Sequence, residues 1–256
     1  MAARAGGFFA GCHRVSPCHR PEAINARARP VGLLPGCQAG ALALLTLPVH
    51  LLQAEPVLIM STQQAKPSTS PVKVRVRLAT EQDMAAIQEI YAHYVLDTTA
   101  SFEEEPPTVA EMTARWQRVT SRGLPYLVAV HRKNVVGYAY AGPFRERSGY
   151  RYTIEDSVYV SQELRGRDVG NALMTELIDR CTVLGFRQMI AVIGDSTNAS
   201  SLALHSRHGF FVVGALSSTC FKFGRWVDAV LMQRILGDGD NSLPPKNPGR
   251  RKQRKK

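Results

Sequence analysis

The chain has 256 residues, which is enough for one or two domains with a sizeable buried core. Its net charge of +11 lies at the two ends, because residues 1–70 carry +4, residues 71–240 are neutral and residues 241–256 carry +7. A neutral central part argues against a dedicated nucleic-acid-binding domain. We therefore expect nucleic acid to be contacted at most weakly, through the basic tail.

The first 71 residues are rich in Ala, Gly, Pro and Arg and contain only two acidic side chains. No packed fold is expected there. Two explanations stay open: a disordered N-terminal extension, such as a transit peptide, or a reading frame that starts too early, with Met60 as the favoured start. The best apolar run, residues 41–50, is short and interrupted by Pro48, so we expect no membrane contact.

The five cysteines are sparse and lack the spacing of a disulfide framework or a zinc site. A reducing compartment is the default for such a chain, so we expect a cytoplasmic protein without a bound metal. Cys181 falls on the apolar stripe of an expected helix and is interpreted as part of the core.

Strand and helix patterns follow each other from residue 72 onward. Residues 72–78 alternate apolar and basic side chains, as in a half-buried strand. Thr80 and Asp83 are spaced like a capping box, which predicts the start of a helix. Its buried stripe is Met84, Ile87, Ile90, Tyr91 and Tyr94. The other flanking elements are a helix at 108–122, strands at 126–130, 135–141 and 188–193, a helix opened by Asn198 and closed by Gly209, and an antiparallel pair at 211–213 and 227–233.

The most informative stretch is a strand that ends at Val160, a loop with arginine and glycine, and a helix that begins at Val169. Period-2 alternation places Glu155, Ser157 and Tyr159 on one face of the strand and Val158 and Val160 on the other. The apolar residues at helical spacing are Val169, Ala172, Leu173, Leu177, Cys181 and Leu184. Such a loop aims backbone N–H groups and the helix dipole at one point, which favours a diphosphate; a plain structural connection is the alternative.

The loop Arg165-Gly166-Arg167-Asp168-Val169-Gly170 resembles the cofactor signature of the GNAT superfamily of N-acetyltransferases, (Gln/Arg)-x-x-Gly-x-(Gly/Ala). Asp168 stands where that family usually has its first glycine. The segment from Asn198 to Phe210 resembles the second signature. The element order β-α-α-β-β-β-α-β-α-β-β also matches. The resemblance implies an α/β (α+β) GNAT fold, with a mixed, mostly antiparallel sheet flanked by helices, at 72–237. From its charge composition we expect a disordered basic tail at 238–256.

The resemblance implies acetyl-CoA as the co-substrate. The residues expected to bind it are Val158, Tyr159, Val160, Arg165, Gly166, Arg167, Asp168, Val169, Gly170, Asn171, Asn198 and Ser201. A carboxylate beside a diphosphate costs about 1 kcal/mol where solvent screens the charges. We therefore expect Asp168 to weaken acetyl-CoA binding, although aspartate tolerates the positive φ that the loop requires.

Residues Tyr152 to Val160 resemble the segment of the phosphinothricin-type branch of the family whose glutamate is the presumed general base. The resemblance assigns that role to Glu155, with Asp156 as a local rival that the register disfavours. His205 occupies the helix position where many GNAT enzymes carry a tyrosine that protonates the thiolate, a task that histidine can perform near neutral pH. A histidine without a catalytic role is the alternative.

Residues Lys222 to Asp228 resemble a segment of the enzymes that acetylate phosphinothricin, methionine sulfone and methionine sulfoximine. An amino acid analogue is therefore the expected acceptor. The residues expected to bind it are Phe102, Arg147, Ser148, Gly149, Tyr150, Arg151, Ser157 and Lys222. Because Phe223 and Trp226 neighbour the last strand, we also expect a homodimer. Two alternatives remain: a protein or peptide N-acetyltransferase, and a GNAT-like binding module weakened by Asp168.

Overall fold

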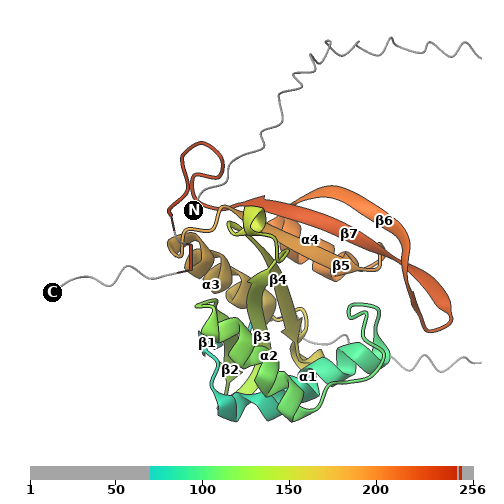
Figure 1. Cartoon of the computed structure of the whole chain (residues 1–256). Coiled ribbons are helices and arrows are strands. Elements are labelled where there is room, and N and C mark those ends of the chain that lie inside the picture. The colour runs from blue at the N-terminus through green and yellow to red at the C-terminus, as the bar shows by residue number, and fades with distance from the viewer. Residues whose placement is uncertain (1–69, 247, 250–256) are drawn as a thin grey trace, which may run out of the picture. The chain divides into compact units, whose positions relative to one another are not determined.

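The computed structural model describes residues 70–246, 248 and 249. They form one seven-stranded sheet in the order β1-β2-β3-β4-β5-β7-β6, drawn in Figure 1. Every neighbouring pair is antiparallel except β4 and β5, which run parallel. The strands are β1 Arg75–Leu78, β2 Tyr126–His131, β3 Asn134–Pro143, β4 Thr153–Val160, β5 Gln188–Gly194, β6 Phe211–Lys222 and β7 Arg225–Ile235. The expected mixed, mostly antiparallel sheet is confirmed.

Four α-helices cover the two faces of the sheet. They are α1 Met84–Asp97, α2 Val109–Ser121, α3 Val169–Val183 and α4 Ala199–Arg207. The pair α1 and α2 lies against one face, over β2 and β3, and α3 packs on the opposite face (Figure 1). The expected element order is confirmed. No helix in residues 70–246 is long and apolar enough to cross a membrane.

Alternation along the strands feeds two hydrophobic cores. In β2, Leu127 and Ala129 enter the core beneath α3, whereas Tyr126 and Val128 enter the core beneath α1 and α2. The second core is built around tyrosines. The rings of Tyr126 and Tyr138 stack at 5.9 Å, and those of Tyr138 and Tyr159 at 5.1 Å. The strand β4 therefore lies between two well-packed layers, which holds its side chains in place.

Capping residues fix the start of the turn that leads into α1 and the start of α2. Thr80 and Asp83 form the expected capping box, and Thr108 and Glu111 form a second one at the start of α2. Asp83 also accepts two hydrogen bonds from Arg77, each 2.7 Å long. This carboxylate therefore ties β1 to the start of α1.

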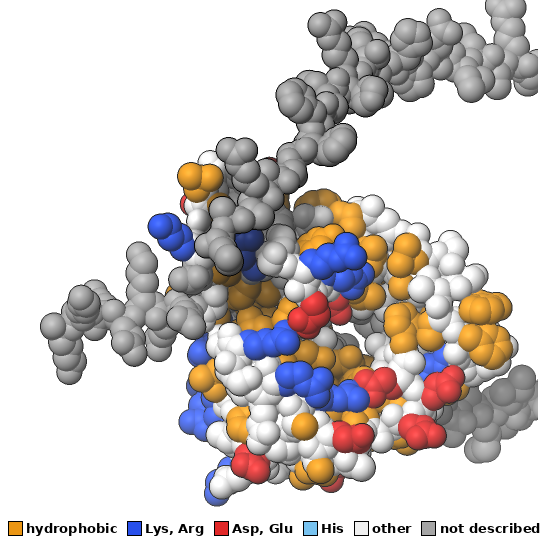
Figure 2. Space-filling model, in the orientation of Figure 1, with side chains coloured by type: hydrophobic (Ala, Val, Ile, Leu, Met, Phe, Trp, Pro, Cys, Tyr) orange, Lys and Arg blue, Asp and Glu red, His pale blue; other side chains and the backbone are white. Residues whose placement is uncertain are grey.

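The last two strands form a hairpin longer than the sequence predicts. The expected strands were 211–213 and 227–233, but β6 has 12 residues and β7 has 11. Register shifts between Leu216 and Cys220 hide the period-2 pattern, because they let polar residues continue the strand. Nearly all of β6 is exposed. Figure 2 shows apolar side chains gathered where Figure 1 draws this hairpin.

The described residues that follow β7 pack onto the domain. Tyr152 donates a 2.7 Å hydrogen bond to the carbonyl of Pro245, and the N–H of Gly249 donates to the carbonyl of Leu184 at 3.0 Å. A Cβ on Gly185 would lie 2.7 Å from Pro245, so the contact is close. The sequence predicts a tail from residue 238, but the packed chain continues past that boundary. The expectations for residues 1–69 and 250–256 fall outside the described residues.

Candidate active site

A cleft opens where β4 and β5 separate. The two strands pair from Thr153 and Gln188 as far as Asp156 and Ala191, and then each continues without the other. The gap between them is the floor of a cavity of about 920 Å³. The ends of α1 and α4 and the segment Thr98–Glu103 form its walls.

The unpaired end of β4 turns backbone groups into the cleft. The N–H of Val160 donates to Tyr94 Oη at 3.1 Å, and the Tyr94 hydroxyl donates to the Val160 carbonyl at 2.8 Å. Val160 therefore points its polar groups away from β3. Because alternate residues of a strand point the same way, the N–H of Val158 also faces the gap. A carbonyl oxygen held in the gap would meet this donor.

The loop before α3 has the shape of an anion-binding turn. Gly166 and Asp168 have φ of +72° and +73°, so the expected positive φ at Asp168 is confirmed. A Cβ on Gly170 would lie 3.3 Å from the Leu204 side chain, which explains the small residue there. No acceptor within residues 70–246 takes the backbone N–H groups of Gly166 or Val169. Free N–H groups at a helix N-terminus fit a diphosphate.

The side chains of this loop are held by neighbours. Asp168 accepts a hydrogen bond from the amide of Asn171, whose oxygen in turn accepts one from His208. The Arg165 guanidinium lies 4.7 Å from the centre of the Tyr94 ring. The carboxylate that was expected to oppose the cofactor is therefore partly engaged by Asn171.

Most of the residues expected to bind the cofactor line the cleft. They are Val158, Tyr159, Val160, Arg165, Gly166, Asp168, Gly170, Asn171, Asn198 and Ser201. Two side chains do not reach it. Arg167 points away and donates to the carbonyl of Ser70 at 3.1 Å, while Val169 is buried in the core beneath α3. The N–H of Val72 donates to the carbonyl of Arg167 at 3.1 Å, so residues 70–72 buttress the loop from outside.

Glu155 lines the cleft on the face of β4 that Tyr140 also contacts. Burial raises the pKa of Glu155, the nearby Asp156 carboxylate adds to this, and the Arg145 guanidinium opposes it. A carboxylate with a raised pKa is a better proton acceptor when ionised. Its position fits the expected base, which stays a prediction.

His205 is buried on α4, with 3% of its surface exposed. Its Nε2 lies 3.1 Å from Asp156 Oδ2 and its Nδ1 lies 2.8 Å from the carbonyl oxygen of Ser201. Burial disfavours the charged ring, but the Asp156 carboxylate outweighs burial and raises the pKa of His205. The ring lines the inner wall of the cleft, but both of its nitrogens are engaged within the protein, which does not favour the expected role as a general acid.

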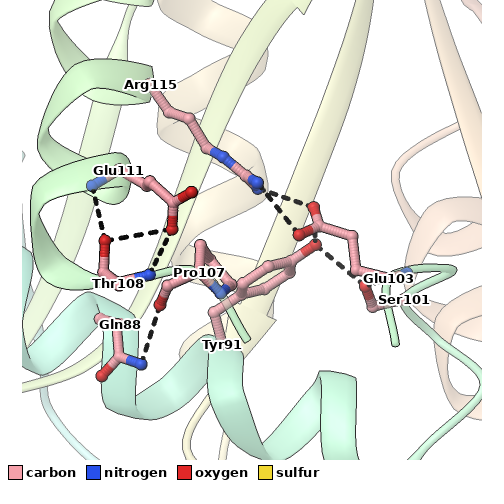
Figure 3. Close-up of polar contacts among 8 residues, drawn as sticks. All are labelled: Gln88, Tyr91, Ser101, Glu103, Pro107, Thr108, Glu111 and Arg115. Carbon is pink, nitrogen blue, oxygen red and sulfur yellow. Dashed lines mark hydrogen bonds and ion pairs between the residues drawn. The ribbon is translucent and has the colours of Figure 1, made fainter. Parts of the chain in front are cut away.

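The segment Thr98–Glu103 forms the outer wall and carries a polar cluster shown in Figure 3. Tyr91 Oη lies 2.9 Å from Ser101 Oγ and donates to Glu103 at 2.8 Å. Arg115 holds Glu103 with two hydrogen bonds of 2.7 and 3.0 Å. Burial raises the pKa of Tyr91 to about 12, so its hydroxyl stays neutral. Sequence reasoning missed this cluster, because three successive glutamates give no sign of which one turns inward.

The residues expected to bind the acceptor divide into two groups. Phe102 and Ser157 line the cleft. Lys222 does not: it is buried and donates to the carbonyls of Thr98 and Ser101 at 3.0 and 2.7 Å, so it supports the wall instead. This corrects the expected substrate contact. The loop of Arg147, Ser148, Gly149, Tyr150 and Arg151 forms a 3-10 turn that does not line the cleft.

A sheet that forks beside a helix terminus with free N–H groups suits the binding of an anionic ligand such as a diphosphate. The family model "Acetyltransferase (GNAT) domain" matches residues 76–231, and the chain belongs to this family. Among the described residues no group of three His, Cys, Asp or Glu side chains could hold a metal ion.

Two curated relatives and one solved structure are similar to this chain over most of their own length. A phosphinothricin N-acetyltransferase of Alcaligenes faecalis is 52% identical over 169 residues, which cover 66% of this chain and 86% of the relative. An L-methionine sulfoximine/L-methionine sulfone acetyltransferase of Salmonella typhimurium (strain LT2) is 39% identical over 163 residues, 64% of this chain and 95% of the relative. The crystal structure of a phosphinothricin acetyltransferase from Sinorhizobium meliloti in complex with AcCoA is 47% identical, with a TM-score of 0.67, covering 69% and 96% of the two chains.

Proposed function

We propose that this chain is an N-acetyltransferase that moves an acetyl group from acetyl-CoA to the amine of a small amino acid analogue. The observation that carries the proposal is the fork of β4 and β5, where Glu155 lies beside inward-facing backbone groups and a free helix terminus. The relatives named phosphinothricin and methionine sulfoximine/methionine sulfone acetyltransferases support the acceptor class.

Acetyl-CoA fits the cleft and supplies the activated acyl thioester. The free N–H groups of Gly166 and Val169 would hold its diphosphate at the start of α3. The Val158 N–H would donate to the acetyl oxygen, where negative charge develops. Asn198 and Ser201, both in the cleft wall, would hold the pantetheine arm.

Glu155 prepares the acceptor in this mechanism. An alkylammonium has a pKa of about 10, so near neutral pH it must lose a proton before it can attack. Glu155 is half-buried, lines the cleft and has a raised pKa, which suits it to take that proton directly or through water. Arg145, which lowers the pKa of Glu155, belongs to the basic loop that continues to Arg151. Arg145, through its charge near Glu155, is the residue of this loop proposed to attract the acceptor's carboxylate.

A thiol-release assay tests the proposal. The protein is mixed with acetyl-CoA and methionine sulfone, phosphinothricin or methionine sulfoximine, and free coenzyme A is followed with a thiol-reactive dye. We expect acceptor-dependent release with at least one analogue. An acidic peptide and a lysine-containing peptide serve as controls for a peptide acetyltransferase. Release with the peptides alone would overturn the acceptor class, and no release with any acceptor would overturn the activity.

We also propose that two copies of the chain associate through the β6–β7 hairpin. The hairpin exposes large apolar side chains that monomers rarely leave in one patch, namely Phe211, Val212, Val213, Leu216, Phe221, Phe223 and Trp226. Light scattering after gel filtration should give twice the chain mass. Trp226→Glu should shift the protein to a monomer, whereas Leu243→Glu, outside the hairpin, should not. A wild-type monomer at micromolar concentration would contradict this proposal.

A cytoplasmic location and a domain that extends from residue 72 to at least Pro245 complete the proposal. The buried thiol of Cys181 and the free thiol of Cys220 suit a reducing compartment. Cell fractionation tests the location: recovery in an exported fraction would contradict it.

Limited proteolysis tests the extent of the domain, since cleavage between residues 238 and 245 should be slow.

A further inference from the structure

Asp156 and Glu155 lie at the fork but point to opposite faces of β4. Asp156 is the last residue of β4 that pairs with β5, and its side chain is 1% exposed. Its Oδ2 lies 3.1 Å from His205 Nε2. Its Oδ1 has no hydrogen-bond partner among residues 70–246. A buried carboxylate with one free oxygen is costly unless a neighbouring charge balances it.

His205 is the side chain that balances this charge. The ring is fixed on three sides: Nδ1 meets the carbonyl of Ser201 at 2.8 Å, Nε2 meets Asp156, and the Phe210 ring packs edge-on at 5.1 Å. Both nitrogens are therefore occupied within the protein. Any influence of His205 on the reaction must pass through Asp156, because no ring nitrogen is left for a substrate.

We propose that Asp156 and His205 form a buried ion pair in which His205 offsets the negative charge that Asp156 places beside Glu155 and holds the strand at the fork, so that both are positioning residues for the base. The inference rests on the proposed function, in which Glu155 accepts the proton.

The charges around the pair make this role specific. Glu155 is flanked by Tyr140 on β3 and by Arg145 in the following loop. On the other face, Asp156 meets His205 on α4 and influences the Cys181 thiol on α3. Burial and the charges of Arg234 and Arg207 lower the pKa of the neighbouring His208, and the Asp168 carboxylate opposes this. Asp156 disfavours ionisation of Glu155, and it would do so more strongly without the protonated His205, which offsets part of its charge.

Two substitutions separate the two charges of the pair. His205→Gln keeps a hydrogen-bond donor but leaves Asp156 unbalanced, so the acidic limb of the kcat/KM profile should move to higher pH by roughly one unit. Asp156→Asn removes the negative charge and with it the partner that keeps His205 protonated, so the limb should move at most slightly to lower pH. The double variant should match Asp156→Asn. No shift in His205→Gln, or a shift to higher pH in Asp156→Asn, would overturn the proposal.

A measurement without substrate separates this inference from the proposed function. The ring of His205 is followed by NMR during a pH titration of the free protein. We expect it to remain protonated to higher pH than an exposed histidine in the wild type, and to lose that shift in Asp156→Asn. If the protein is inactive but His205 titrates as expected, the ion pair is supported and the proposed acetyltransferase activity is rejected. An unshifted His205 in a well-folded, active protein would reject the pair.

Discussion

Glu155 is the residue on which the proposed chemistry depends. The groups around Glu155 differ in charge. Tyr140 and Ser157 have neutral hydroxyl groups, Arg145 carries a positive charge, and Asp156 carries a negative one. Burial raises the pKa of the carboxyl, but the group must be ionised to accept a proton. Activity should therefore rise with pH through the pKa of Glu155, at a pH above the range of an exposed glutamate.

Glu155→Gln should lower kcat at neutral pH by roughly 10² to 10³-fold, the usual contribution of a general base. The rate should recover partly at high pH, because the acceptor amine then loses its proton without help. Steady-state kinetics from pH 6 to 10 check this. Glu163→Gln, an exposed position on the turn before the loop, is the matched control and should retain full activity. Equal rates for wild type and Glu155→Gln at every pH would remove Glu155 from the mechanism.

Asp168 is the second residue whose effect can be isolated. Its φ is +73°, a conformation that costs glycine nothing, and its carboxylate lies at a proposed diphosphate site. Asp168→Gly should tighten acetyl-CoA binding several-fold, measured by calorimetry, and Asp168→Asn should give most of the gain if charge is the cause. Weaker binding by both variants would mean that the link from Asp168 to Asn171 is what shapes the loop.

At the scale of elements, the β6–β7 hairpin fastens the outer wall of the cleft. Lys222 holds the carbonyls of Thr98 and Ser101, and Arg225 pairs with Asp195, which also accepts from Thr99 at 3.0 Å. A Cβ on Gly194 would lie 2.2 Å from the Thr99 carbonyl oxygen, so the wall rests directly on the end of β5. The hairpin and the α1–α2 connection thus form one unit.

Lys222→Met should therefore raise KM for the acceptor by about tenfold, because it leaves two buried carbonyls without a donor. The affinity for acetyl-CoA, whose proposed site is the loop before α3 at the other end of the cleft, should change little. Kinetics with each substrate varied in turn measure the two effects. Lys246→Met, at an exposed position, is the control. Equal loss of affinity for both substrates would point to general destabilisation.

At the scale of the whole molecule, three carboxylates hold the layers together. Burial opposes ionisation of Asp83 and Glu103, but their bonds to Arg77 and Arg115 outweigh it and lower both pKa values. The pKa of Asp195 is also lowered, and the hydrogen bond from the Arg225 guanidinium is the largest cause. These pairs link β1 to α1, α2 to the cleft wall and β5 to the hairpin.

Stability should fall on acidification for this reason. A carboxyl group whose pKa is lower in the folded state stabilises the fold fully above its unfolded pKa, about 4. That contribution is lost as the pH falls from there through the folded pKa. Urea unfolding at pH 7, 5, 4 and 3 should show a declining midpoint below about pH 4.5. The urea midpoint of Arg77→Gln should be lower than that of the wild type at pH 7 and should decline less on acidification. A midpoint that is independent of pH would contradict this account.

The sequence predicts the fold well where one local signal decides an element. The capping box at Thr80, the apolar stripe of α1 and the positive φ at Asp168 are short-range features, and all are seen in the structure. The hairpin was underestimated because a bulged strand loses its alternation. Resemblance pointed to a loop and a carboxylate that both line the cleft.

The rest depends on distances that no short segment encodes. Asp156 and His205 are 49 residues apart, and Glu103 meets Arg115 across a turn of irregular chain. The burial of Lys222 could not be foreseen, since lysine is almost always exposed unless paired. Motif likeness placed Arg147 and Arg151 near the acceptor by analogy, whereas the turn they occupy lies apart from the cleft in a single chain.

The buttress formed by residues 70–72 has a practical consequence for anyone who produces this protein. Ser70 contacts Arg167 beside the first turn of α3, whereas Gly249 contacts Leu184 beyond its last turn. A helix of 15 residues separates these two points by about 22 Å. An affinity tag joined just upstream of Ser70 would lie against the outside of the loop before α3 and disturb the hydrogen bonds that hold it. One joined after Gly249 lies beyond the opposite end of this helix, and so is the better handle for binding studies.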